Sequence, residues 1–295
     1  MLYDLFRRYR ELGFGYFKLD FLSHTLNARR FADGAASGNE IIRRLLTPIA
    51  AGAGDGAELL GCNYPFAAGS GLVDAVRIAC DIHARRDAVA TNSVSIAARS
   101  WTQPYWWRND PDFALIRGPA TSDDPDLTRL RPAHVYVTPE GRDDAAFGNY
   151  TIAGELGLEE VKILLGIVLI SGGTINFSDR FPKLNAQGLA LARKLAAAPP
   201  GEAAQVLDLF EHEQPERWRQ QVAPTHFRLL LVNWSDAGRE YSLAPEACGF
   251  TGCIPATVTD FWDGTPITAT TMILPGHSSR LLEWHFPAEA GADRA

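Results

Sequence analysis

Two acids at the ends of predicted strands are the strongest candidates for catalysis. The segment 14–20, FGYFKLD, is short and aromatic, which is typical of a strand that ends at Asp20. Because side chains alternate along a strand, Lys18 and Asp20 point to one face and Leu19 to the other. A neighbouring cation keeps a carboxylate ionised, as a nucleophile requires. A salt bridge at the strand end explains the same pair about equally well.

The second acid, Asp81, closes a predicted strand over 74–80 that contains a single arginine, Arg77. A charge inside an apolar strand costs several kcal/mol unless it is paired, so we expect Arg77 to have a partner or a ligand. Structural pairing and function are comparable explanations for this segment.

Two other segments place polar residues where chemistry could occur. Cys62-Asn63-Tyr64-Pro65 follows a predicted strand over 57–61 and by itself indicates a turn. Asn109-Asp110-Pro111-Asp112 sets two acids around a proline, which is typical of an Asx turn.

The spacing of apolar residues predicts alternating helices and strands before residue 200. Helices are expected over 2–13, 39–51 with Asn39 as its cap, 92–101 and 184–197, and from Leu158; strands are expected over 14–20, 57–61, 74–80, 105–107 and 174–177. This α/β alternation favours a parallel sheet covered by helices, open or closed into a barrel, and we favour a barrel. Residues 118–150 are expected to form a long loop above the sheet.

The chain after residue 200 has a different pattern. Short alternating strands are expected over 227–234, 241–243, 257–262 and 279–284, with turns at Asp236-Ala237-Gly238 and Asp263-Gly264. The sequence therefore predicts two domains: a β/α domain over 1–200 and a small antiparallel β domain over 201–295.

Composition excludes several classes of protein. The 295 residues carry a net charge of −7, which argues against a nucleic-acid partner. The apolar run 163–170 is too short to cross a membrane, and no signal sequence precedes residue 10, so the chain as written is expected in the cytoplasm. The four cysteines fit neither a disulfide scaffold nor a paired-cysteine zinc site, and the glycines at 52, 54 and 56 do not form a nucleotide-binding motif. We expect no cofactor.

Several motifs together resemble one family. They are Phe17-Lys18-Leu19-Asp20, LGCNYP at 60–65, DAVRIACD at 74–81, NDPD at 109–112, and Ser171-Gly172-Gly173 with Ser178-Asp179. In this order they resemble the motifs of α-galactosidase-like enzymes, the melibiases of glycoside hydrolase families 27 and 36. One such tetrapeptide is weak support, but five in order on predicted strand ends are specific, and the β tail matches the family's C-terminal domain.

The resemblance implies a retaining glycosidase that acts on a glycoside or oligosaccharide with terminal α-linked sugars, with galactose expected only by family habit. By family position, Asp20 is the nucleophile and Asp81 the general acid/base, Lys18, Arg77, Cys62 and Asn63 bind sugar hydroxyls, and Asp110 and Asp112 are supportive. A retaining mechanism places the two catalytic carboxyls roughly 5 to 5.5 Å apart. We further expect Asp20 to be ionised, Asp81 to be protonated through burial or the Asp20 charge, and the Arg77 guanidinium to face the sugar.

The chain also departs from the family. About five barrel strands are expected instead of eight, and Asp20 corresponds to the family's fourth, so the fold expected is an incomplete (β/α)8 barrel. A missing N-terminal segment or a second copy in a homo-oligomer would complete it. A different reading is a non-catalytic remnant that binds carbohydrate through Trp106 and Trp107. A metal-dependent hydrolase using Asp81, His83, Asp110 and Asp112 is the weakest reading, because no His-x-x-His spacing occurs.

Overall fold

The computed structural model describes residues 1–103, 105–124 and 155–288. The α-helices are α1 (Leu2–Glu11), α2 (Gly38–Ala53), α3 (Arg86–Arg99), α5 (Leu158–Ile170) and α6 (Ala186–Ala196). The strands before residue 200 are β1 (Tyr16–Leu19), β2 (Glu58–Gly61), β3 (Ala75–Arg77), β4 (Arg108–Asp110), β5 (Phe113–Ala114) and β6 (Asn176–Phe177). Most of the predicted loop, 125–150, lies outside the described residues.

Strands β1 to β4 form one parallel sheet in chain order, so β1 is an edge strand and β4 is the other end. Helix α2 connects β1 to β2 and α3 connects β3 to β4, while only a short 3-10 turn (Phe66–Gly69) lies between β2 and β3. Strands β5 and β6 form a separate parallel pair, which a hydrogen bond from the Thr174 amide to the Asn109 carbonyl joins to β4. The described strands thus form a parallel β/α array consistent with part of a barrel.

Local sequence explains where these elements begin and end. The side chain of Ser37 accepts the Glu40 amide and the Glu40 carboxylate accepts the Ser37 amide, so a capping box starts α2. The expected cap at Asn39 is therefore wrong by two residues. The aromatic segment 105–107 is a turn and not the expected strand, and β4 begins at Arg108. The rings of Trp106 and Trp107 pack edge to face with centroids 5.2 Å apart.

The chain after residue 200 forms two antiparallel sheets. One has five strands in the order β11 (Thr257–Asp260), β13 (Ser278–His285), β9 (His226–Asn233), β8 (Arg217–Ala223) and β7 (Gln205–Val206). The other pairs β10 (Arg239–Ser242) with β12 (Thr271–Leu274). The sequence pattern does not predict strands β7, β8 and β12.

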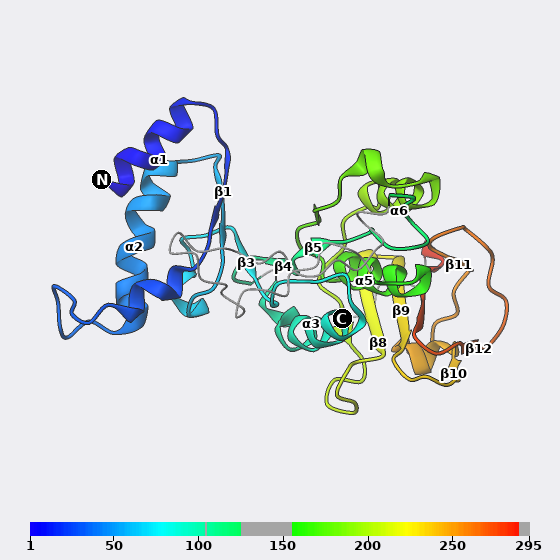
Figure 1. Ribbon diagram of the computed structural model, residues 1–295. Coiled ribbons are helices and arrows are strands. Elements are labelled where there is room, and N and C mark those ends of the chain that lie inside the picture. Colours follow the sequence, from blue (N-terminus) through cyan, green and yellow to red (C-terminus); the bar gives the residue numbers. More distant parts are fainter. Residues whose placement is uncertain (104, 125–154, 289–295) are drawn as a thin grey trace.

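A single apolar cluster joins the two parts of the chain. Helix α5 is buried along almost its whole length, and it packs in one cluster with Leu230, Val232 and Leu281 of the five-stranded sheet. The approach is close: a Cβ at Gly166 would lie 3.0 Å from a Leu230 methyl carbon. Figure 1 shows α1 and α2 at one end of the molecule, this sheet at the other, and β3, β4 and β5 between them.

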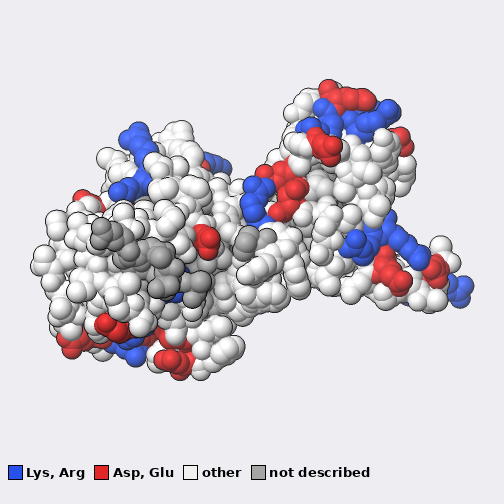
Figure 2. Space-filling model, turned by 180° about the vertical axis from the view of Figure 1, so that it is seen from behind, with Lys and Arg blue, Asp and Glu red and all other residues white. Residues whose placement is uncertain are grey.

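On the face drawn in Figure 2, neither positive nor negative charge dominates the surface. Basic and acidic side chains lie next to each other over the end of the molecule formed by α1 and α2 and along the lower edge. None of the described helices is long and apolar enough to span a membrane.

Candidate active site

Asp20 lies directly after β1, on the same side as Lys18. The Lys18 ammonium is 3.4 Å from Asp20 Oδ2, and the two side chains are 34% and 32% exposed. Phe21 adopts a left-handed backbone with φ of 54°, and its amide donates to Asp20 Oδ1 at 2.7 Å. The sequence-based expectation that β1 brings Lys18 and Asp20 together is confirmed by this ion pair.

The surroundings of Asp20 favour its ionised form. Partial burial alone would raise its pKa, but hydrogen bonds from the Cys62 thiol and the Phe21 amide, together with the Lys18 charge, lower the pKa below its usual value. Burial, and then the bond to Asp20, raises the pKa of Cys62 to about 12, so this thiol stays protonated and acts as a donor. These contacts therefore stabilise the ionised form of Asp20.

Asn63 follows β2 and connects two strand ends. It also has a left-handed backbone, with φ of 54°. Its carbonyl accepts the Ser23 amide at 2.7 Å, and its side-chain oxygen accepts the Ser23 hydroxyl at 2.8 Å. These bonds hold the loop after β1 against the end of β2, and the amide nitrogen of Asn63 remains for a ligand. Sequence reasoning missed Ser23, because nothing local marks a contact made across 40 residues.

Arg77 is the centre of a buried network of acids. Its Nε donates to Asp110 Oδ2 at 2.8 Å, Nη2 lies 2.7 Å from Asp112 Oδ1, and Nη1 lies 3.2 Å from Asp81 Oδ1. The Arg77 side chain is 4% exposed, and those of Asp110 and Asp112 are 0% and 2% exposed. Asp110 and Asp112 therefore hold Arg77 in place, which matches the supportive position that the resemblance implied.

This network changes the pKa values of two of its members. Burial alone would lower the pKa of Arg77, but the charges of Asp110 and Asp112 outweigh it and raise the pKa. Burial raises the pKa of Asp112, which the Arg77 charge and the Ile82 amide offset only in part. The pairing is strong because two carboxylates and a guanidinium share one dry site.

The surroundings of Asp81 differ from those expected for a proton donor. Its side chain is 71% exposed, so the expected burial is wrong. Arg77, whose guanidinium is expected to face the sugar, places its Nη1 3.2 Å from this carboxylate.

Five of the six site residues predicted from the sequence line one pocket of about 550 Å³. Asp20, Cys62, Asn63, Arg77 and Asp81 all line it, and Lys18 reaches it through its ion pair with Asp20. Loops after β1, β2 and β3 contribute these residues, so the carboxyl ends of three neighbouring parallel strands build the pocket, as in other β/α folds. Sequence reasoning did not single out Ser95 and Arg99, which α3 adds to the wall.

The alternative readings of the sequence meet difficulties here. Asp110 and Asp112 direct their oxygens to Arg77, a cation, which disfavours them as ligands of a metal ion. Trp107 is 4% exposed and belongs to the core, so its face cannot stack on a sugar, whereas Trp106 is 44% exposed.

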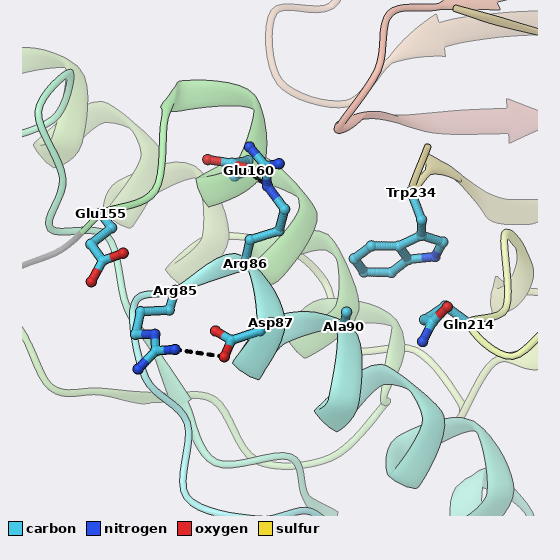
Figure 3. A pocket seen from close by; sticks show the side chains of 8 residues that line it. All are labelled: Arg85, Arg86, Asp87, Ala90, Glu155, Glu160, Gln214 and Trp234. Atoms are coloured by element: carbon cyan, nitrogen blue, oxygen red, sulfur yellow. Dashed lines mark hydrogen bonds and ion pairs between the residues drawn. The ribbon is translucent and has the colours of Figure 1, made fainter. Parts of the chain in front are cut away.

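A second pocket, of about 480 Å³, lies between the starts of α3 and α5 and the end of β9. Its lining consists of Arg85, Arg86, Asp87, Ala90, Glu155, Glu160, Gln214 and Trp234 (Figure 3). Arg85 pairs with Asp87 and Arg86 with Glu160, so these charges neutralise each other. It includes none of the motif residues.

The remaining motif residues position the backbone. A Cβ on Gly173 would lie 1.7 Å from the Asn109 carbonyl oxygen, so only glycine allows this close approach to β4. Asp179, which is fully buried, accepts the Ile116 amide at 2.6 Å and pairs with Arg117 at 3.0 Å. Both motifs therefore fix the loops that follow β4 and β5.

No protein-family model matches the chain, but solved structures do. A GH27 β-L-arabinopyranosidase from Geobacillus stearothermophilus superposes with a TM-score of 0.67 over 97% of this chain, at 13% identity. An α-galactosidase from Saccharomyces cerevisiae with raffinose gives 0.63 over 96% at 13% identity. An Arthrobacter globiformis isomalto-dextranase complexed with panose gives 0.63 over 97% at 17% identity.

The chain spans only part of these proteins: 62% of the arabinopyranosidase, 74% of the yeast enzyme and 48% of the isomalto-dextranase. The matches establish the fold, a β/α barrel arrangement with a C-terminal β domain. They support the resemblance to family 27, and membership of family 36 stays a prediction.

Proposed function

We propose that this chain, which shares its fold with α-galactosidase-like glycoside hydrolases, is a retaining glycosidase for terminal α-linked sugars, with Asp20 as nucleophile and Asp81 as acid/base. One observation carries the proposal: Asp20, surrounded by groups that favour its charge, lines the same pocket as Asp81. Two carboxylates in one pocket, with different surroundings, meet the basic requirement of glycoside hydrolysis.

The reaction proceeds in two steps. Asp20 attacks the anomeric carbon while Asp81 gives its proton to the leaving oxygen, so the glycosidic bond breaks and a glycosyl ester forms. Asp81 then removes a proton from water, which attacks the anomeric carbon and releases Asp20. Two displacements on the same carbon retain its configuration.

Asp81 can act as an acid only when its contact with Arg77 is broken. Its exposed side chain is free to rotate toward a bound sugar, while Arg77 stays fixed by Asp110 and Asp112. A sugar hydroxyl that accepts from Arg77 Nη1 would replace Asp81 there and leave the Asp81 carboxyl group available to the leaving oxygen. We assign the sugar hydroxyls to Lys18, Cys62, Asn63 and Arg77, which surround Asp20.

The pocket needs further walls, and we propose that additional β/α units pair with the free edge of β1. Tyr16 of β1 is 45% exposed, and two aromatic residues that flank the strand in sequence, Phe14 and Phe21, are 55% and 59% exposed. An exposed apolar edge strand favours pairing with another strand. Those units belong to a segment of the same polypeptide or to a partner, including a second copy.

The test uses aryl α-glycosides of galactose, glucose and N-acetylgalactosamine and an aryl β-L-arabinopyranoside. We expect turnover of at least one substrate, its loss in Asp20→Asn, and retained configuration of the first product by NMR. Azide should rescue Asp20→Gly and yield the glycosyl azide of inverted configuration, because a small anion fills the place of the missing nucleophile. Asp33→Asn, which removes a paired carboxylate outside the pocket, is the matched control and should keep full activity.

A non-catalytic carbohydrate-binding chain is the second candidate. The Arg77–Asp81 contact favours it, because one oxygen of the proposed acid is already engaged by Arg77 Nη1 at 3.2 Å. Sugar binding by calorimetry without turnover of any of these aryl glycosides would establish this function and refute the glycosidase.

A further inference from the structure

Strands β9 and β13 bring two histidines and a glutamate together, far from the proposed active site along the chain. His226 and His285 are directly opposite each other in the antiparallel register, with ring centroids 4.1 Å apart. Glu283 lies two residues before His285, so its side chain shares the same face. One ligand atom of each residue lies within 4.8 Å of the others.

In the described part of the chain the imidazoles of this group have ring nitrogens without a hydrogen bond, while Glu283 Oε1 lies close to His226 and Arg228. His226 is 16% exposed, and its buried Nε2 makes no hydrogen bond of good geometry, although it lies 3.3 Å from Glu283 Oε1. In the described part of the chain, no hydrogen bond reaches either ring nitrogen of His285, which is exposed at the end of β13. A buried ring nitrogen without a partner is costly unless a ligand satisfies it.

The neighbouring charges decide which ion this group could bind. Arg228 Nε lies 3.5 Å from Glu283 Oε1, and Lys194 also acts on this carboxylate. The other Arg228 nitrogens are bound to Gln220 and the Pro199 carbonyl, so the guanidinium cannot move away easily. These two cations disfavour ions that depend on carboxylate charge, such as Ca²⁺ and Mg²⁺. Imidazole nitrogens suit Zn²⁺, Ni²⁺ and Cu²⁺.

A second group of potential ligands, Asp208, His212 and Glu216, serves as a comparison. Both Asp208 oxygens already accept backbone amides, at 2.8 and 3.2 Å. Glu216 pairs with Arg239 and accepts the Tyr241 hydroxyl at 3.0 Å. The oxygens of this group are filled by the protein, whereas the nitrogens of His226 and His285 are not.

We propose that His226, Glu283 and His285 form a binding site for one divalent transition-metal ion of the zinc class. The two imidazoles and Glu283 provide three ligands, and water fills a fourth position. Small side-chain rotations must shorten the present spacing to the ligand separations around a zinc ion. Such an ion would clamp β9 to β13 on the side of the sheet that faces α5 and α6. The site is independent of the proposed glycosidase activity.

The test is calorimetric titration of the purified full chain with Zn²⁺ in a non-chelating buffer. We expect saturable binding of one ion per chain, unaffected by excess Mg²⁺, and a higher melting temperature with the ion present. Loss of a group that only orients a metal ligand costs about 10- to 100-fold in affinity. Loss of a ligand should cost at least as much, so we expect His285→Ala to weaken zinc binding by about 100-fold or more. Glu283→Gln should also weaken zinc binding.

Matched controls identify the site. His212→Ala tests the comparison group and Cys80→Ser tests the exposed thiol; both should keep the wild-type affinity. His285→Ala lies at an exposed strand end and serves as the test variant if His226→Ala does not fold. The proposal is overturned if the wild-type chain shows no saturable binding, if His285→Ala keeps the wild-type affinity, or if binding disappears in either control.

Discussion

Replacing Arg77 by methionine should destabilise the protein strongly and in a pH-dependent way. The guanidinium is 4% exposed and compensates Asp110 and Asp112, which are almost fully buried. Removing one partner from a buried ion pair costs about 3–5 kcal/mol, because it leaves charge without compensation. For 295 residues the entropy of unfolding is about 0.6 kcal/mol per kelvin, so the melting temperature should fall by about 5–8 °C.

The sign of the pH dependence follows from Asp112. Its pKa in the folded protein is raised by burial, so the folded state binds more protons than the unfolded state above the ordinary aspartate pKa. Stability then falls as the pH rises through that window. Without Arg77 the pKa rises further, because the Arg77 charge is one of the influences that lower it. The loss of stability in Arg77→Met should therefore be larger at pH 8 than at pH 5.

Thermal unfolding at both pH values, followed by circular dichroism, measures this difference. Arg99→Met is the matched control: Arg99 lines the same pocket, but its Nη1 donates to the Ile78 carbonyl and not to a carboxylate. Adding Asp112→Asn to Arg77→Met should restore part of the lost stability. An equal loss at pH 5 and pH 8, or a larger loss at pH 5, would refute the reasoning about the buried acids.

Two further changes test the site and its support. In Cys62→Ala the loss of the thiol donor should raise the pKa of Asp20 toward its ordinary value, whereas Cys62→Ser, which keeps a donor, should leave this pKa low. A ¹³C-NMR titration of the Asp20 carboxyl group measures the difference. An unchanged midpoint in Cys62→Ala would contradict the hydrogen bond from Cys62 to Asp20. Gly173→Ala places a Cβ 1.7 Å from a β4 carbonyl and should cost about 1–3 kcal/mol or more in denaturant unfolding, whereas Gly34→Ala, with nothing within 4 Å, should be neutral. Equal stability of the two glycine variants would refute the close approach.

The sequence was most informative where chemistry depends on local periodicity. Alternation along β1 places Lys18 beside Asp20, and the 3.4 Å ion pair follows from a spacing of two residues. The order of strand ends likewise anticipates the pocket, because parallel strands direct their carboxyl ends to one edge. Local patterns were sufficient for these features.

Long-range register determined what the sequence could not reveal. Arg77 meets Asp110 33 residues later only because β3 pairs with β4 in the register Arg77↔Asp110. Strand β8 was missed because Arg217 and Arg219 look like a solvated stretch, although they alternate with the buried Trp218 and Gln220. The exposure of Asp81 also depends on neighbouring loops, which no motif describes.

The apolar cluster shared by α5 and the five-stranded sheet limits when the chain can fold during its synthesis. From Ile163 to Ile170 helix α5 carries no charged or polar side chain, and Leu230 and Leu281 cover it only after about 60 to more than 100 further residues have emerged from the ribosome. Until β9 and β13 have been synthesised, the apolar surface that they cover on this helix stays exposed to water or to a chaperone. Truncation before β13 should therefore give an aggregating chain and not a smaller soluble protein.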